Sequence, residues 1–387
     1  MRPVVPCGRV VGLDVARALA LVAMMATHIL PDVGPDGSIA LNQQLAGGRA
    51  SGLFAVLAGV SVSLISGRTT PQRGRERLAT SAGLAVRAVL IAVVGLLLAE
   101  VDSGIAVILT YYGLLFLLAL PFLGMGARAL AVASAVTLTA VPVLSHLVRP
   151  LLPEARLASP ELASLAEPAP LLAELLLTGY YPALPWLAYL LAGMAVGRLD
   201  LSQPRMGAGI AAVGAWVAAL SMLLSLAALS LPGVRRTLAE TFTGLGANRP
   251  LEVMLERGLY GTTPTGSWWW LTVRTPHTAT PFDLAHTIGT ALLVIGVAML
   301  VGRALPRALA VVGGAGAMTL TLYSAHVLSR APGWWDADTL ETFFGQVAVV
   351  LVVGAAFRVA QVRGPLEAVV ARVQSAVRRA AARTPRT

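Results

Sequence analysis

The sequence predicts an all-α protein: a polytopic membrane bundle of about ten transmembrane helices with both termini in the cytoplasm. Hydrophobic residues make up 56% of the 387 residues and charged residues only 12%, against roughly 25% charged in soluble domains. Apolar runs of about 20 residues, the length that a bilayer requires, recur along nearly the whole chain. All 29 basic residues are arginine. They gather in the connections on one side of the predicted spans, which is typical of the cytoplasmic side.

The apolar runs give the limits of the expected helices. The ten expected spans cover about 12–31, 50–67, 79–99, 104–124, 129–148, 179–198, 208–231, 282–301, 308–328 and 343–362. Two connections on the outer side, 149–178 and 232–281, are long. We expect residues 1–363 to form one membrane domain and residues 364–387 a basic cytoplasmic tail, whose valines and arginines suit a short helix on the membrane surface.

Composition also argues against several function classes. The net charge of +10 invites a nucleic-acid partner, but membrane topology already explains where the arginines lie, so no nucleic acid is expected. The single cysteine, Cys7, leaves no disulfide framework and no thiolate metal cluster. Gly-rich phosphate loops, nucleophile elbows and paired metal-ligand motifs are absent from the sequence. We therefore expect no metal, and a lipid bilayer as the first partner.

The first expected span, GLDVARALALVAMMATHIL, carries three ionisable residues: Asp14, Arg17 and His28. At 100° per residue, Arg17 and His28 differ by roughly 20° around the helix, and Asp14 lies within about 60° of both. Ionisable groups in a membrane span usually face a bundle interior or a wet cavity. The stripe places an acid and a base at the cytoplasmic end and an imidazole about 16 Å away at the outer end. A salt bridge with a snorkelling Arg17 is the structural alternative.

The segment TPHTATPFDLAHTIG contains a second group of candidates: His277, Asp283 and His286. Asp283 follows Thr280 at a predicted helix start, so helix capping is the simplest role for it. His286 lies three residues further on, where the Asp283 carboxylate could orient its ring. Metal binding by this cluster is a weaker alternative, because no spacing is diagnostic.

The remaining candidates follow from position. His146 and His326 complete a set of five histidines near the outer face, where histidine is a natural general base. Arg87 lies deep in the third span and is expected to point into a cytoplasmic cavity. The substrate-side candidates are Trp268, Trp269 and Trp270, which suit an interfacial anchor or a stacking platform for a sugar, together with Tyr180 and Tyr181 at the start of the sixth span.

The opening helix resembles that of integral-membrane acyltransferases. In the acyltransferase-three family this helix reads Leu-Asp-x-x-Arg and places a histidine eleven residues after the arginine. Leu13, Asp14, Arg17 and His28 match that pattern. Other segments resemble the heparan-α-glucosaminide N-acetyltransferase family and its bacterial relatives: SGLFAVLAGVSVSLISGR, LTYYGLLFLLALP, YPALPWLAYLLAGMAVGRL, PHTATPFDLAHTIGTALLVIG and AMTLTLYSAHVL. The resemblance covers most of residues 9–330.

The resemblance implies an acyltransferase of the bacterial plasma membrane. Acetyl-CoA, or another acyl-CoA, would enter from the cytoplasm and bind near Asp14, with its phosphates held by Arg17 and by Arg87 or the loop from Arg73 to Arg77. The acceptor would be a hydroxyl or amine of an extracytoplasmic glycan or glycolipid, and a homodimer is compatible with this family. In the lysosomal enzyme the catalytic histidine lies in the loop after the first helix, which here contains none. That role therefore falls to His28 or a later histidine. A transporter or flippase whose polar stripe lines a translocation path is the alternative.

Overall fold

The computed structural model describes residues 10–34, 36–153, 156, 158–242, 250–261 and 263–383. Throughout this described part the ordered elements are helices, and the one other feature is an isolated bridge between Val33 and Ile39. The helices are long and apolar, and many of their large apolar side chains point outward. The predicted class, an all-α polytopic membrane protein, is confirmed.

Seven helical segments of the described residues are long and apolar enough to cross a membrane. They are α1 (Val11–Ile29), α2 with α3 (Leu41–Ala46 and Arg49–Ile65), α4 (Gly74–Ala99), α6 (Ala127–Val148), α9 (Met206–Ser230), α12 (Pro281–Ala304) and α15 (Leu340–Val359). An eighth results if α7 (Pro168–Ala173), continued by a π turn, forms one bent span with α8 (Ala183–Gly197) across a 50° break.

Three of the ten expected spans are shorter than the sequence predicts. The expected span 179–198 contains only α8, a helix of 15 residues. The expected span 104–124 consists of α5 (Leu109–Ala119) followed by a 3-10 turn. The expected span 308–328 is divided into α13 (Pro306–Val312) and α14 (Thr319–Ser329). The glycines of the GGAGA sequence between α13 and α14 explain the division, because glycine weakens a helix.

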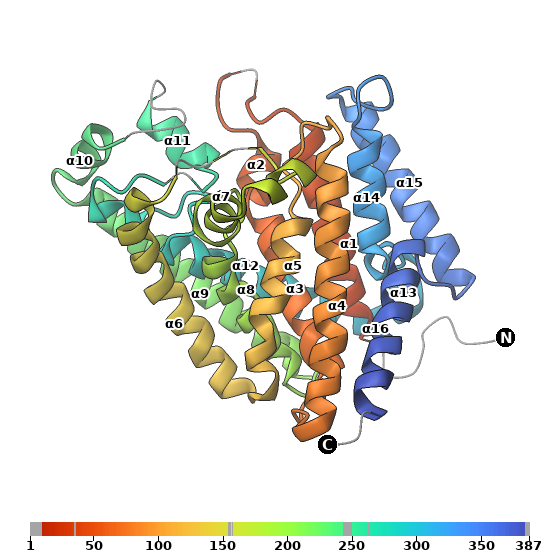
Figure 1. The fold of residues 1–387 in the computed structure, drawn as a ribbon. Helices are drawn as coiled ribbons and strands as arrows, with labels where there is room; N and C mark the ends of the chain where they lie inside the picture. Colours follow the sequence, from red (N-terminus) through yellow and green to blue (C-terminus); the bar gives the residue numbers. More distant parts are fainter. Residues whose placement is uncertain are drawn as a thin grey trace.

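The two ends of the bundle carry different elements (Figure 1). We call the end where α1 and α4 begin the inner end, following the arginine bias of the sequence. The opposite, outer end carries α2, α7 and two short helices, α10 (Val234–Glu240) and α11 (Leu251–Arg257). A small apolar core at the outer end, centred on the fully buried Trp270, joins α10 and α11 to the end of α9.

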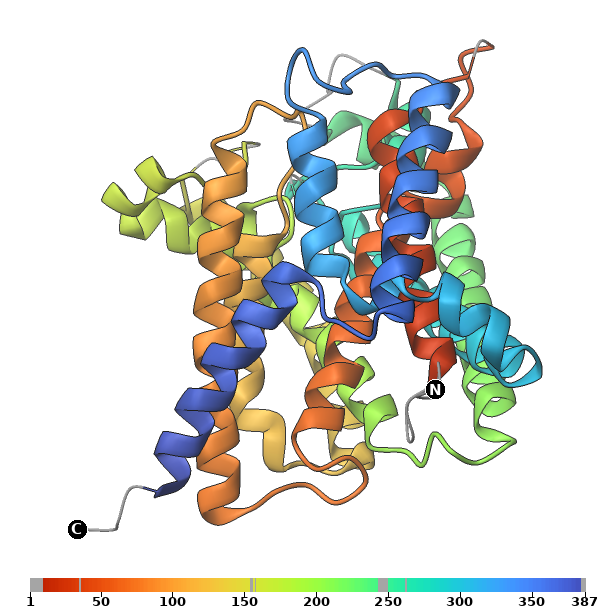
Figure 2. The ribbon, with the colours of Figure 1, turned by 90° about the vertical axis from the view of Figure 1, so that its right-hand side faces the viewer.

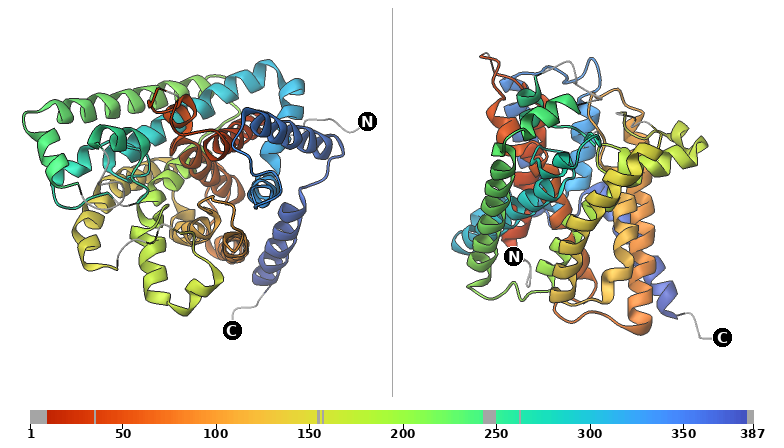
Figure 3. Two further views of the ribbon diagram at one scale, coloured as in Figure 1. Left: turned by 90° about the horizontal axis from the view of Figure 1, so that it is seen from above. Right: turned by 90° about the vertical axis from the view of Figure 1, so that its left-hand side faces the viewer.

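Helix α1 lies inside the bundle, against α3, α12, α14 and α15, while α9 packs along α12 at one edge (Figure 3). Close approach between α3 and α8 depends on two glycines. A Cβ at Gly193 would lie 1.8 Å from the Val56 carbonyl oxygen, and one at Gly59 would lie 2.0 Å from that of Leu190. Small residues allow helices in a membrane to touch along their backbones. This contact fixes one wall of the interior beside α1.

The basic tail forms helix α16 (Pro365–Arg383), which lies along α4 (Figure 2). Glu367 fastens it: one carboxylate oxygen accepts hydrogen bonds from the backbone N–H groups of Leu320 and Thr321, and the other accepts from the Thr321 hydroxyl. These are unpaired donors at the start of α14, so the carboxylate caps that helix. Val370 is buried, whereas Val369 on the same tail is exposed.

Candidate active site

At the inner end, Asp14 lies between two guanidinium groups. It is 2% exposed, and its two carboxylate oxygens lie 2.9 Å from Nη1 of Arg17 and 2.6 Å from Nη2 of Arg358. Arg17 also donates to the Ser61 hydroxyl at 3.0 Å, and Arg358 donates to the Ala310 carbonyl. The expected Asp14–Arg17 pair is therefore present, but α15 adds a second arginine that the sequence did not single out.

Arg87 points into the bundle, as its depth in α4 suggests. Its guanidinium carbon lies 5.7 Å from the centre of the Phe116 ring, in cation–π geometry. Among the described residues no hydrogen-bond partner holds the Arg87 side chain, which lines two adjoining cavities. It is therefore a cation available to a ligand.

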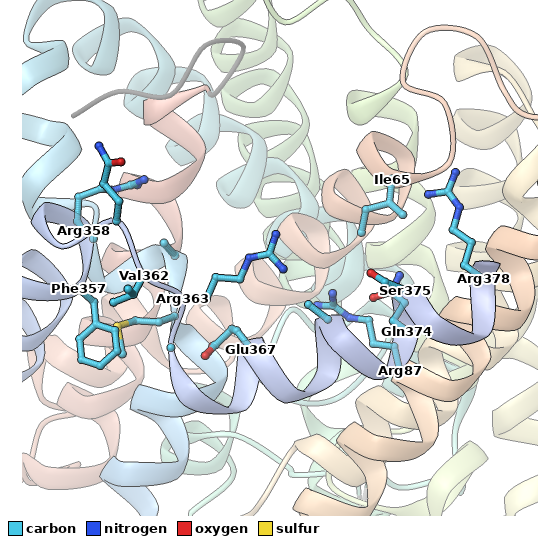
Figure 4. A pocket seen from close by; sticks show the side chains of 16 residues that line it. Ile65, Arg87, Phe357, Arg358, Val362, Arg363, Glu367, Gln374, Ser375 and Arg378 are labelled. Carbon is cyan, nitrogen blue, oxygen red and sulfur yellow. The ribbon is translucent and has the colours of Figure 1, made fainter. Parts of the chain in front are cut away.

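The larger of these cavities is an open pocket of about 730 Å³ at the inner end. Figure 4 shows its lining side chains, with Arg363 projecting from the connection between α15 and α16, and Arg378 from the far part of α16. Arg87 and Arg358 complete four arginines, accompanied by the single carboxylate of Glu367. Such a surplus of guanidinium groups suits a ligand with several phosphates, which arginine binds bidentately.

A narrower cavity of about 130 Å³ continues from Arg87 into the bundle between α1, α3, α4, α5 and α14. It shares Ile65 and Arg87 with the inner pocket, and Arg17 lines its wall. Its apolar lining reaches Met24 on α1 and Tyr323 on α14. Met24 lies one turn before His28, and Tyr323 one turn before His326. The cavity thus leads from the arginine-rich pocket toward the outer histidines.

His28 and His326 form a pair at the outer end. Nδ1 of His28 lies 3.1 Å from Nε2 of His326, and the two rings are nearly parallel, with an interplanar angle of 6°. On the far side of His326, Nδ1 lies 2.8 Å from the amide oxygen of Gln346 on α15. His326 and Gln346 are each 3% exposed, while His28 is partly exposed. The sequence suggested that His326 would reach the layer of His28, but it gave no indication of direct contact.

Asp283 and His286 are not joined, although their spacing suggested a pair. Asp283 accepts a hydrogen bond from the Ala279 N–H at 3.1 Å, and its own N–H donates to the Thr280 hydroxyl, so its observed role is to cap α12. His286 instead contacts α9, where its Nδ1 lies 3.1 Å from the Ala218 carbonyl oxygen. The residues of the expected cluster are neighbours, but the carboxylate and the imidazole have different partners.

His277 lies among aromatic rings. The ring centres of Tyr180, Tyr181 and Tyr260 are 5.2 to 5.5 Å away, and that of Trp186 is 6.4 Å away. Burial, assisted by the nearby Arg49 charge, lowers the pKa of His277 to about 3. Its Nδ1 has no hydrogen-bond partner among the described residues.

The three tryptophans have different surroundings. Trp270 is completely buried and donates from Nε1 to the Thr241 hydroxyl at 3.0 Å. Trp268 is 54% exposed and lies against His146, with ring centres 4.6 Å apart. Trp269 is 37% exposed. Only Trp268 and Trp269 therefore present ring surface that a lipid or a sugar could touch.

A polar pocket of about 430 Å³ opens at the outer end beside the base of α2. Its lining includes Arg49, Arg274 and Gln43. The Gln43 amide donates to the carbonyl of Thr27, the residue next to His28. Burial lowers the pKa of Arg274, and the Asp283 carboxylate partly offsets that effect. This pocket therefore connects through Gln43 to the backbone beside His28.

The described residues contain no group of three or more His, Cys, Asp or Glu side chains arranged to hold a metal ion. A family model describing the catalytic domain of heparan-alpha-glucosaminide N-acetyltransferase matches residues 9–231, more than half of the chain. The chain belongs to this family. No curated protein matches it. Family membership identifies a transferase, and the apolar helices agree with a membrane location.

The match spans α1 to α9 and therefore includes Asp14, Arg17, His28 and Arg87. His326, Gln346 and the arginines of the α15–α16 region lie beyond it. Sequence reasoning missed Gln346, Arg358 and Arg363. Gln346 could have been found as the one amide within the apolar run FFGQVAVVLVVG, because a polar residue inside a span is a functional candidate.

Proposed function

We propose that this family member transfers an acetyl group from acetyl-CoA, bound from the cytoplasm of a bacterial cell, to an amine or hydroxyl of an extracytoplasmic sugar. The supporting observation is the path through the bundle. An arginine-lined inner pocket adjoins a narrow apolar cavity at Arg87, and that cavity ends one helical turn below His28 and His326. A transferase that joins a cytoplasmic donor to an outer acceptor requires such a path.

The inner pocket is the proposed site of the nucleotide and its phosphates. Arg358 is committed to Asp14, and Arg17 to Asp14 and Ser61. The phosphate-binding role therefore passes mainly to Arg87 and Arg363. Arg17, held by Asp14, then lines the wall along which the pantetheine arm rises, about 16 Å from Arg17 to His28.

The thioester carbonyl would stand beside His28 at the top of the cavity. His28 Nε2 takes a proton from the acceptor as its nitrogen or oxygen attacks the thioester carbon. The carbon–sulfur bond breaks, and the sulfur of coenzyme A leaves with the proton that His28 returns. A positioned imidazole contributes roughly 10²- to 10⁴-fold to such a step. His277 and His286, with ring nitrogens buried or bonded elsewhere, are weaker candidates for the base.

The acceptor would approach through the outer polar pocket, which Gln43 connects to the backbone beside His28. The exposed rings of Trp268 and Trp269 would serve as an apolar surface for a sugar or for the membrane interface. Tyr180 and Tyr181, which pack against His277, would form the inner wall of the acceptor site.

The test of the chemistry uses purified protein in detergent, acetyl-CoA labelled in the acetyl group, and a panel of amino sugars and glycolipids. We expect label transfer that falls at least about 100-fold in His28→Ala, the lower end of what a general base contributes. His286→Ala, in which the ring is bonded to a backbone carbonyl, serves as the matched histidine control and should retain most activity. Undiminished transfer in His28→Ala would refute the assignment of the base.

The donor site has its own test. Arg363→Gln and Arg87→Gln should each weaken coenzyme A binding about tenfold or more, since a charge-assisted hydrogen bond contributes roughly 1.5–3 kcal/mol. Arg372→Gln, an exposed arginine of α16 outside the pocket, is the matched control. Calorimetric titration with coenzyme A measures all three. A protein that bound no coenzyme A would instead favour the transporter alternative.

A further inference from the structure

The side-chain amide of Gln346 has only one orientation that satisfies its neighbours. Its nitrogen donates to the Trp335 carbonyl at 3.2 Å, and its oxygen lies 2.8 Å from Nδ1 of His326. Reversing the amide would place its oxygen against a carbonyl oxygen, where no proton is available. Because an amide oxygen can only accept, Nδ1 of His326 must be protonated.

The protonation of His326 determines that of His28. A neutral imidazole with a proton on Nδ1 has a lone pair on Nε2, and Nε2 of His326 lies 3.1 Å from Nδ1 of His28. His28 must therefore donate from Nδ1, which leaves the lone pair on its own Nε2. Among the described residues this Nε2 has no hydrogen-bond partner. The hydrogen bonds that run from Gln346 through His326 to His28 thus leave Nε2 of His28 as a basic nitrogen with a lone pair.

We propose that Gln346 is a positioning residue, which acts through His326 to hold His28 in the tautomer whose Nε2 can accept a proton. The inference rests on the proposed function, because it identifies what orients the base of that reaction. Gln346 is itself fixed. The Trp335 carbonyl that receives its amide nitrogen also accepts from Nη1 of Arg330, and Nη2 of Arg330 lies 2.5 Å from Asp338.

The two side chains that orient His28, those of His326 and Gln346, carry no charge. Arg330, at the end of α14, and His277, in the loop before α12, are the charged or titratable groups close enough to act electrostatically on the histidine pair. No carboxylate of the described residues is hydrogen-bonded to either ring. An amide orients a ring as a carboxylate would, but it supplies no charge to stabilise the protonated pair. That difference makes the proposal testable.

Two substitutions separate the two hydrogen bonds of Gln346. Gln346→Leu removes both. Gln346→Glu keeps an acceptor toward His326 but, when ionised, loses the donor toward Trp335. The purified variants are assayed for kcat and KM with acetyl-CoA and an acceptor sugar between pH 5.5 and 9. Gln203→Leu, in the exposed connection before α9, is the matched control for the leucine variant.

We expect Gln346→Leu to lower kcat about 10- to 100-fold, part of the usual contribution of a general base, with KM and coenzyme A affinity unchanged. Gln346→Glu should retain kcat at high pH within about threefold. Its acid limb should move upward by about one pH unit or more, because a carboxylate favours the protonated pair. Full activity in Gln346→Leu would overturn the proposal. So would an equal loss at all pH values in Gln346→Glu, because the contact with Trp335 would then be the one that matters.

A readout without turnover separates this inference from the proposed function. Nitrogen-15 spectra of protein with labelled histidine should show protonated Nδ1 on both His28 and His326, assigned through single-histidine variants. In Gln346→Leu both rings should lose this fixed tautomer. Nε2 protonation in the native protein would overturn the positioning role even in an active enzyme. If the protein shows these fixed tautomers but transfers no acetyl group, the result supports the positioning role of Gln346 and refutes the proposed reaction.

Discussion

Replacing Asp14 with asparagine should destabilise the protein more than any other single change at the inner end. The substitution keeps the shape of the side chain but removes its charge, leaving two guanidinium groups beside a neutral amide. Arg358 has only 8% of its side chain exposed, so water replaces the lost partner there poorly. Breaking a buried pair by removing one member usually costs 3–5 kcal/mol, and we expect a loss of about that size.

The two arginines should contribute unequally. Arg17 has 20% of its side chain exposed and keeps Ser61 as a partner, so Arg17→Met should cost less than Arg358→Met. The double variant Asp14→Asn/Arg358→Met should be more stable than the sum of its two losses predicts, by at least about 1.5 kcal/mol, because its members share one interaction. Arg372→Met, exposed on α16, should be near neutral.

Reversible unfolding by SDS titration in mixed micelles measures these differences, with the fluorescence of the seven tryptophans as the signal. Strictly additive losses would show that Asp14 and Arg358 do not interact energetically. An Asp14→Asn variant as stable as the parent protein would refute the reasoning altogether, since it would mean that the buried charge contributes nothing net.

Three further outcomes follow from the structure. His277 has a pKa of about 3 when folded, against 6.5 for an ordinary histidine, so the unfolded chain binds its proton first as the pH falls. Its stabilising contribution is complete above pH 6.5, and because of this ring the free energy of unfolding should fall by about 1.4 kcal/mol between pH 7.5 and 5.5. Unfolding titrations of His277→Asn should show a loss smaller by this amount than those of the parent protein. Gly193→Ala should lower the melting temperature through a cost of about 1–3 kcal/mol, because its Cβ meets a backbone oxygen at 1.8 Å. The control Gly209→Ala has open space and should not lower it; equal melting temperatures would refute the close contact. Glu367→Gln should weaken coenzyme A binding several-fold and expose the connection before α16 to limited proteolysis, and unchanged cleavage would show that the carboxylate does not fasten the helix.

Much of the fold could be predicted because the bilayer imposes it. A span needs about 20 apolar residues, and that length is readable in a sequence. The division between α13 and α14 was not predicted, although its glycines were visible. The reason is that the mean hydropathy of 308–328 is that of a continuous span and does not reveal a break in the helix. Helix α16 was expected on the membrane surface, whereas in the structure it also closes the inner pocket along α4.

The site was predictable where it depends on one helix. The spacing of Asp14, Arg17 and His28 placed them on one stripe, and the structure gives them partners at opposite ends of α1. Contacts between distant segments were not readable. Arg358 contacts Asp14 directly, and Gln346 reaches His28 through His326, each more than 300 positions earlier in the sequence. The periodicity of α15 does not show which helix its polar residues will contact.

The carboxylate of Glu367 bears on where the chain can be divided. Composition suggests a boundary after residue 363, where apolar sequence gives way to a basic tail. A chain cut there would lose the acceptor for two backbone donors at the start of α14, at about 1–3 kcal/mol for each donor left buried. It would also lose one wall of the inner pocket. The end of the last apolar span, α15, is therefore not the end of the folding unit, and a fused tag or a truncation belongs after α16.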